Sequence, residues 1–90
     1  MKVLVIGNGG REHAICRALM TANPQPSLFI APGNPGTAEC GENIALKVDD
    51  IDGIVKFAKD NAIDLVIPGP ELPLVVGIGD ALDEAGIACC

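Results

Sequence analysis

A continuous apolar run near the start of the chain, followed at once by a cluster of glycines, constrains the fold more than any other feature. Val3-Leu4-Val5-Ile6 is aliphatic throughout and ends at Gly7, which is typical of a parallel strand covered on both faces. Residues 11–20 then carry apolar side chains at helical spacing. The stripe expected to face the core consists of Ala14, Ile15, Ala18 and Leu19. The chain therefore opens with a strand, a glycine turn and a helix.

The same alternation of strand and helix continues along the chain. Further strands are expected at residues 27–31, 44–48, 64–67 and 87–90, of which 44–48 is the weakest. One helix should follow Asp50, a good N-cap, and another should run from Pro73 to Ala85 and stop at Gly86. Strands that alternate with helices form a parallel sheet with right-handed crossovers. We therefore predict one α/β domain over residues 1–90, a Rossmann-like parallel sheet with helices on both faces.

Composition and charge exclude several classes of protein. Hydrophobic residues make up 49% of the chain, enough for a globular core, and the net charge of −6 argues against a nucleic-acid partner. Apolar stretches are interrupted by Gly or Pro before the roughly 20 residues that a membrane helix needs. Residues 3–6 are also too short for the core of a signal peptide. We expect a cytoplasmic protein that has no membrane partner.

The cysteines and the single histidine do not form a recognisable metal motif. The four cysteines lack CxxC spacing, which favours reduced thiols over disulfides or a metal site. One imidazole, that of His13, with scattered cysteines does not make a zinc site. We therefore predict no metal site in this chain. The cysteines are Cys16, Cys40, Cys89 and Cys90.

Three loops should meet at the carboxyl ends of the strands, where open parallel sheets bind ligands. The first, residues 7–11, leads into a helix N-terminus that favours an anion, and a phosphate is the expected ligand. The alternative is a tight turn that needs glycine only for its backbone angles. The third loop presents Glu71, either to the hydroxyls of a sugar or as a charge at a helix N-terminus. In the middle loop, Asn34 and Thr37 could bind a ligand, although local turn contacts explain them as well.

A dinucleotide site is disfavoured by the residue at position 12. The GxGxxG pattern would need a third glycine there, but the residue is Glu12, which would obstruct close helix packing and repel a pyrophosphate. The acidic residue expected about 20 residues further on is missing as well. No Gly-Lys pair occurs, so the chain also lacks the phosphate loop of nucleoside triphosphatases.

Three motifs together resemble one known family. Residues 7–14 (GNGGREHA), 31–38 (APGNPGTA) and 69–75 (GPELPLV) are similar to the N-terminal domain of phosphoribosylamine-glycine ligases. The resemblance covers essentially all 90 residues. It implies an ATP-grasp enzyme of de novo purine biosynthesis, which joins glycine to 5-phosphoribosylamine, and a chain that is a truncated N-terminal, pre-ATP-grasp domain of it.

The resemblance also implies which parts of such an enzyme bind each ligand and carry out catalysis. ATP and Mg²⁺ (or Mn²⁺) would be bound by lobes outside these 90 residues, which leaves no catalytic residue here and an isolated chain without activity. His13 is expected to make a structural hydrogen bond in preference to transferring a proton. The alternative is a standalone nucleotide- or NAD-binding module of the same fold. The residues implied in substrate binding are Asn8, Gly9, Gly10, Arg11, Gly33, Asn34, Gly36, Thr37, Pro70 and Glu71.

Overall fold

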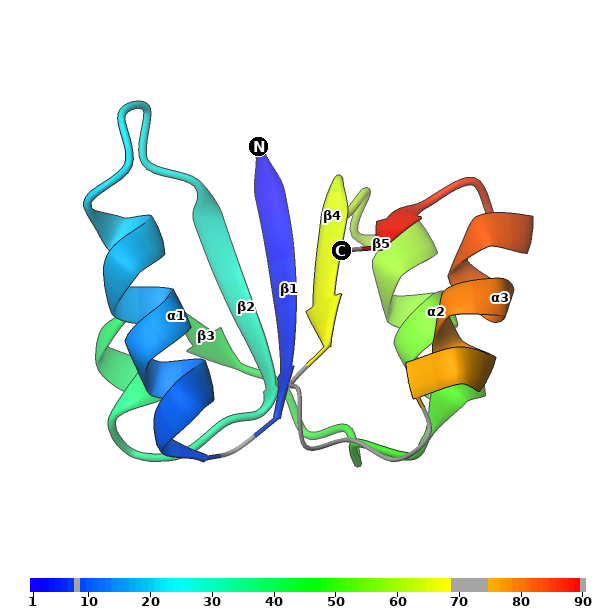
Figure 1. The fold of residues 1–90 in the computed structure, drawn as a ribbon, viewed down its shortest axis with the longest axis horizontal. Helices are drawn as coiled ribbons and strands as arrows, with labels where there is room; N and C mark the ends of the chain where they lie inside the picture. Colours follow the sequence, from blue (N-terminus) through cyan, green and yellow to red (C-terminus); the bar gives the residue numbers. More distant parts are fainter. Residues whose placement is uncertain (8, 69–74, 90) are drawn as a thin grey trace.

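A parallel sheet forms the centre of the molecule in the computed structural model, which describes residues 1–7, 9–68 and 75–89. Within these residues the sheet has five strands in the order β3-β2-β1-β4-β5, and every pairing is parallel (Figure 1). The strands are β1 (Lys2–Gly7), β2 (Ser27–Pro32), β3 (Glu42–Asn43), β4 (Leu65–Pro68) and β5 (Ala88–Cys89). The predicted fold class is confirmed.

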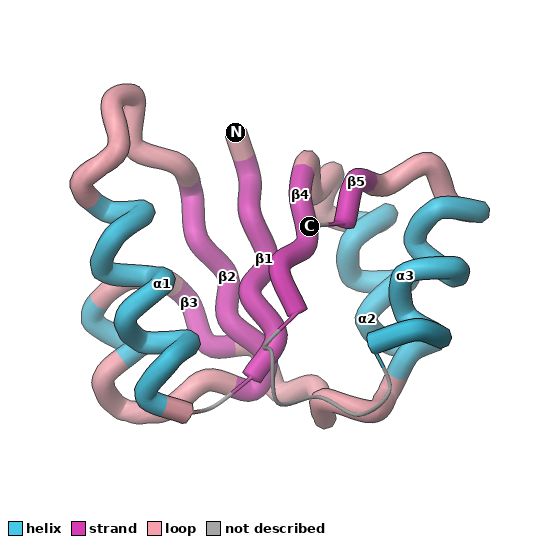
Figure 2. The backbone as a smooth tube through the Cα atoms, viewed as in Figure 1, coloured by secondary structure: helices cyan, strands magenta, loops and turns pink. Residues whose placement is uncertain are grey.

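Helices cover both faces of this sheet. They are α1 (Gly10–Met20), α2 (Ile51–Asp60) and α3 (Val75–Glu84), with a short 3₁₀ helix η1 (Thr37–Glu39) after β2. Helix α1 lies on one side of the strands, and α2 and α3 lie on the other (Figure 2). None of the helices described is long and apolar enough to cross a membrane.

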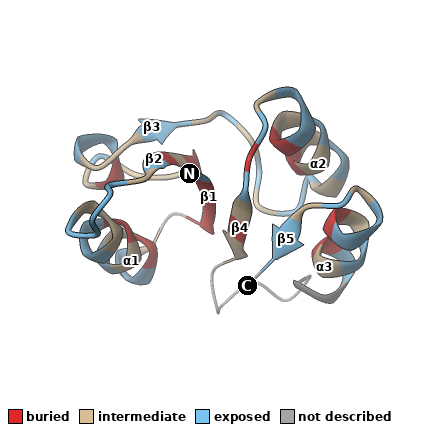
Figure 3. Cartoon of the chain, turned by 90° about the horizontal axis from the view of Figure 1, so that it is seen from above, coloured by how far each residue is buried: buried red, intermediate tan, exposed pale blue. Residues whose placement is uncertain are grey.

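The side chains of β1 alternate between two hydrophobic clusters. Val3 and Val5 pack with Cys16 of α1, whereas Leu4 and Ile6 pack with residues of α2 and α3. Because both faces of the strand are covered, its apolar run is continuous, as the sequence indicated. Burial is accordingly concentrated on the central strands and on the inward sides of the helices (Figure 3).

The strand order reverses on either side of β1. The chain passes from β1 to β2 and β3 on one side and then crosses to β4 and β5 on the other. At the carboxyl end of the sheet, Ile6 is paired in register with Ala31 of β2 and with Pro68 of β4. This edge is the topological switch point, at which doubly wound sheets bind ligands.

The strand predicted at residues 44–48 is wrong. The pairing with β2 involves Glu42 and Asn43, and one further backbone bond joins Ile44 N–H to Ile30 O at 2.6 Å. The half-buried side chains of residues 44, 46 and 48 instead pack against the cluster beneath α2 and α3. Their alternation therefore reflects an irregular segment that lies across the sheet face, a pattern that sequence periodicity cannot distinguish from a paired strand.

The buried face of α1 also differs from the predicted stripe. Glu12 and Cys16 are the buried residues of this helix, and Ile15 is half-buried like Leu19. Ala14 and Ala18 are exposed. The predicted stripe did not include Glu12 or Cys16, so the inward face of the helix is rotated from the one expected.

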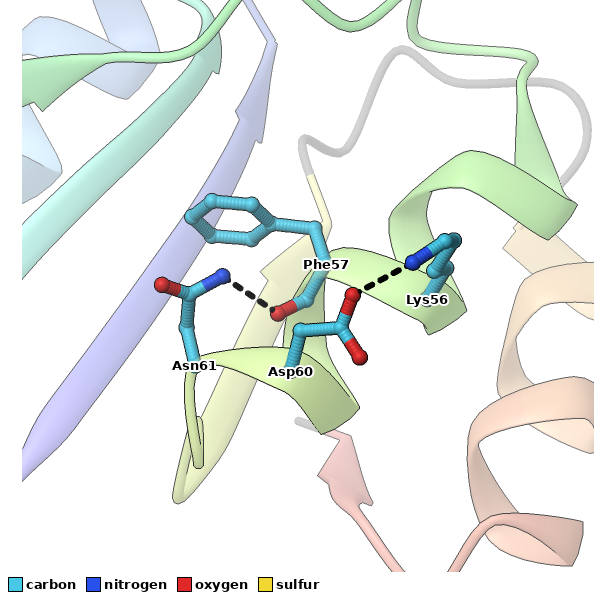
Figure 4. A network of polar contacts seen from close by, with 4 residues as sticks. All are labelled: Lys56, Phe57, Asp60 and Asn61. Carbon is cyan, nitrogen blue, oxygen red and sulfur yellow. Dashed lines mark hydrogen bonds and ion pairs between the residues drawn. The ribbon is translucent and has the colours of Figure 1, made fainter.

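The ends of α2 follow the local sequence signals. The Asp50 side chain accepts a hydrogen bond from Gly53 N–H at 3.0 Å, as its N-cap assignment predicted. At the other end, Asn61 Nδ2 donates to Phe57 O at 2.9 Å, and Lys56 pairs with Asp60 at 2.6 Å (Figure 4). The hydrogen bond to the Asp60 carboxylate raises the pKa of Lys56, but this exposed pair contributes little to stability.

The remaining predicted elements agree with the structure where it describes them. Gly86 ends α3 with a φ of +75°, the left-handed conformation expected of a glycine stop. Strand β5 confirms the strand predicted after this helix, while Cys90 lies outside the described residues. The predicted helix start at Pro73 also lies outside them, and the described part of α3 begins at Val75.

Candidate functional site

The turn between β1 and α1 is built around Gly7. This residue has a φ of +143°, in the region that favours glycine. A Cβ atom at this position would overlap the side chain of Glu12. Glycine is therefore needed at this position for two reasons: it adopts the positive φ, and it leaves room for the Glu12 side chain.

Glu12 lies inside the protein, against this turn. Its side chain is 0% exposed, and Oε2 accepts a hydrogen bond from Gly9 N–H at 3.1 Å. Gly9 is the N-cap of α1, so the contact is the backward half of a capping box. The carboxylate occupies the space where a dinucleotide-binding turn has its third glycine, as the sequence indicated.

The first and second loops lie side by side at the carboxyl edge of the sheet. Gly33 N–H donates to Gly7 O at 3.0 Å, and Asn34 Nδ2 donates to Gly9 O at 3.4 Å. Two segments that are about 25 positions apart in the chain are thus joined. Predicted site residues from two of the three loops come together in this way.

A network of hydrogen bonds shapes the second loop from within. The Thr37 hydroxyl oxygen accepts from Asn34 N–H at 2.7 Å and lies 2.8 Å from Asn43 Oδ1. Asn34 Oδ1 accepts from Thr37 N–H at 2.9 Å, and Asn43 Nδ2 donates to Asn34 O at 2.9 Å. Thr37 is fully buried, so these contacts agree with the local-turn interpretation of its role. Asn43 was not among the predicted site residues, because no local motif marks it.

Gly36 lets the second loop approach α1 closely. A Cβ atom on Gly36 would overlap the imidazole ring of His13. His13 is half-buried and, with Arg17 and Glu39, lines an open surface pocket between α1 and η1. The ring therefore lies against the loop at Gly36, while the hydrogen bond expected of His13 stays a prediction.

The Cys16 thiol lies buried behind the first turn. Its pKa is raised from 9.0 to about 11, mainly because the thiol is buried and also because Cys40 and Glu12 lie nearby. At neutral pH this residue is therefore a thiol and a poor nucleophile. Among the described residues, Cys16, Cys40 and Cys89 form no disulfide bond. Over residues 1–7, 9–68 and 75–89, no three His, Cys, Asp or Glu side chains gather as metal ligands.

Some of the predicted site residues lie at the carboxyl edge of the sheet, and others lie outside the described residues. Gly9 lies at the N-terminus of α1, and the exposed residues Gly10 and Arg11 form its first turn. The residues of the second loop adjoin them, as described above. Asn8, Pro70 and Glu71 lie outside the described residues, so the contribution of the third loop stays a prediction.

The strand order and the glycine turn at the switch point define a Rossmann-type α/β domain. Solved structures share this fold: a phosphoribosylamine-glycine ligase from Thermotoga maritima has a TM-score of 0.57 and 23% identity over 84% of this chain and 17% of its own. RSP, a Rex-family repressor, has a TM-score of 0.65 and 22% identity over 96% of this chain and 41% of its own. Because the sequence identities are below 25%, these structures show only that the fold is shared.

Sequence comparison identifies the particular family. The family described as phosphoribosylglycinamide synthetase, N domain, matches residues 1–90, and the chain belongs to this family. The phosphoribosylamine-glycine ligase of Allochromatium vinosum is 50% identical over 99% of this chain, and that of Vibrio parahaemolyticus is 53% identical over 97%. The chain spans 21% of the length of each of these relatives.

Proposed function

We propose that this chain is the N-terminal substrate-binding domain of an ATP-dependent ligase that joins glycine to 5-phosphoribosylamine in de novo purine biosynthesis. The observation that carries this proposal is the identity of about half of all residues, over nearly the whole chain, with phosphoribosylamine-glycine ligases. A cytoplasmic location is part of the proposal.

The first loop is proposed to bind the phosphate of the sugar substrate. Gly10 and Arg11 lie in the first turn of α1, where backbone N–H groups and the helix dipole favour an anion. Both residues are exposed, and Arg11 adds a positive charge. Asn8 and Gly9 belong to the same loop.

The second and third loops are proposed to complete the sugar-phosphate site. Gly33, Asn34, Gly36 and Thr37 form the wall beside the first loop, with Asn34 and Thr37 maintaining its shape through their mutual hydrogen bonds. In the third loop, Pro70 would orient Glu71, whose carboxylate would accept hydrogen bonds from the ribose hydroxyls.

ATP and its Mg²⁺ or Mn²⁺ ion are proposed to bind to parts of the longer ligase outside these 90 residues. The described part of this chain does not fit a metal site, because it gathers no group of three metal-ligating side chains. Catalysis is proposed to belong to those parts of the ligase as well, and no catalytic residue is assigned to this domain. Its task is to bind the sugar phosphate and to orient the amine toward the rest of the enzyme.

A standalone nucleotide- or NAD-binding module is not favoured. The buried Glu12 fills the position at which the dinucleotide fingerprint requires glycine. The relatives compared above, at about 50% identity, are phosphoribosylamine-glycine ligases. The Rossmann-type neighbours with other names are under 25% identical and say nothing about the ligand.

Kinetics of the longer ligase test the proposal. That enzyme should form glycinamide ribonucleotide, and Glu71→Gln should raise the KM for phosphoribosylamine roughly ten- to hundredfold, because a charge-assisted hydrogen bond is lost. The KM values for glycine and ATP should stay nearly unchanged, since neither carries that ribose. A longer enzyme without ligase activity would refute the function. Unchanged KM values with a lower melting temperature would instead make Glu71 a helix-terminus charge.

A further inference from the structure

The backbone of Gly9 is hydrogen-bonded through both its N–H and its carbonyl group. Its N–H donates to Glu12 Oε2 at 3.1 Å, and its carbonyl oxygen accepts from Asn34 Nδ2 at 3.4 Å. The same carbonyl also accepts the first helical bond, from His13 N–H at 3.2 Å. The two peptide groups that meet at Gly9 are therefore held by a side chain of α1 on the N–H side and by one from the second loop on the carbonyl side.

Glu12 acts on both ends of the turn. Its carboxylate reaches Gly9, while its Cγ and Cδ atoms lie where a side chain on Gly7 would have to be. Burying a carboxylate is costly unless it is well hydrogen-bonded, and an exposed residue could cap the helix at less cost. Glu12 is nevertheless 0% exposed. We therefore attribute its burial to its role in fixing the geometry of the loop, and not to helix stability alone.

We infer that Glu12 is a positioning residue for the phosphate-binding loop. Its hydrogen bond to the Gly9 N–H fixes the backbone at the start of α1, and so the direction in which the following N–H groups, those of Gly10 and Arg11, point at the ligand. This inference rests on the proposed function, since the ligand in question is the sugar phosphate. Asn34 of the second loop donates to the Gly9 carbonyl oxygen, and this contact holds the first and second loops in a fixed position relative to each other.

Two uncharged variants separate the hydrogen bond from the charge. Glu12→Gln keeps the size of the side chain and an acceptor oxygen for Gly9 N–H, whereas Glu12→Ala loses both. The probe is ribose 5-phosphate, titrated into the 90-residue protein and followed by the amide resonances of Gly9 and Gly10. We expect the alanine variant to bind about tenfold more weakly than the glutamine variant. Exchange of the Gly9 amide proton should be faster in the alanine variant alone.

Glu84→Ala is the matched control, because Glu84 is exposed on the distant helix α3. It should alter neither ribose 5-phosphate binding nor exchange at Gly9. If Glu12→Ala does not fold, Glu12→Asp takes its place and is compared with the wild type, since both are charged and the shorter side chain should lose contact with Gly9.

The outcomes distinguish this inference from the proposed function. Equal ribose 5-phosphate affinities in the variants with and without the acceptor overturn the positioning role, whatever their thermal stability. A wild-type chain that does not bind ribose 5-phosphate, while Gly9 exchange still depends on residue 12, counts against the proposed ligand and not against the contact. Equal Gly9 exchange in all variants overturns the contact itself.

Discussion

Gly33 is the residue of the second loop at which a side chain is least tolerable. Its φ is +75°, and a Cβ atom would overlap Asn43 Oδ1 and the Thr37 hydroxyl. We expect Gly33→Ala to destabilise the protein by about 1–3 kcal/mol, from the strained backbone and the displaced hydrogen bonds. Urea unfolding followed by circular dichroism measures the change.

Gly79→Ala is the matched control for Gly33→Ala. Gly79 lies inside α3, and a Cβ atom there would meet nothing within 4 Å. Alanine should stabilise the helix by up to about 1 kcal/mol, because glycine is the poorer helix former. If Gly33→Ala were as well tolerated as Gly79→Ala, the shape of the second loop would not depend on its glycine.

Among the elements, α2 shows most clearly how a local signal sets a boundary. Asp50 accepts the hydrogen bond of Gly53 N–H, and replacing it by alanine should cost about 0.5–2 kcal/mol. Asp52→Ala is the comparison, since Asp52 is an exposed acid in the first turn of the same helix and contributes only through the dipole, roughly 0.3–1 kcal/mol. Urea unfolding should rank the two losses in this order, and equal losses would contradict the capping role.

The elements with strong local signals were predicted well. The apolar run of β1, the cap at Asp50 and the stop at Gly86 each depend on neighbouring residues, and each agrees with the structure. Strand β3 was misplaced because its two residues, Glu42 and Asn43, carry no strand pattern of their own. They pair only because β2 presents an open edge beside them.

For the domain taken together, we propose that it presents one face of the ligand site. The carboxyl edge of the sheet brings the first two loops together, but nothing in the described residues closes over a ligand there. We predict that the isolated 90-residue chain forms no glycinamide ribonucleotide from phosphoribosylamine, glycine and ATP. Product analysis with the purified chain checks this prediction. More glycinamide ribonucleotide than in a sample without protein would contradict the proposal that ATP binding and catalysis belong to other parts of the ligase.

Binding by the isolated chain should nevertheless be detectable and weak. A half-site forms fewer contacts and still bears the entropic cost of association, so ribose 5-phosphate should bind with low affinity. Titrations with NAD and ATP serve as comparisons. Affinity for NAD without affinity for ribose 5-phosphate would favour the dinucleotide alternative.

The amino-acid sequence was sufficient to predict the α/β class and the glycine turn at the end of β1, and it carries the resemblance to the ligase family. These features rest on short-range patterns: a continuous apolar run, helical spacing, and glycines at positions that need them. The tertiary structure alone decided that Glu12 points inward, that β3 lies at residues 42–43, and that Asn43 supports the second loop. The physical reason is that these outcomes depend on contacts between segments far apart in the chain, where packing and hydrogen bonding override the polarity of a single residue.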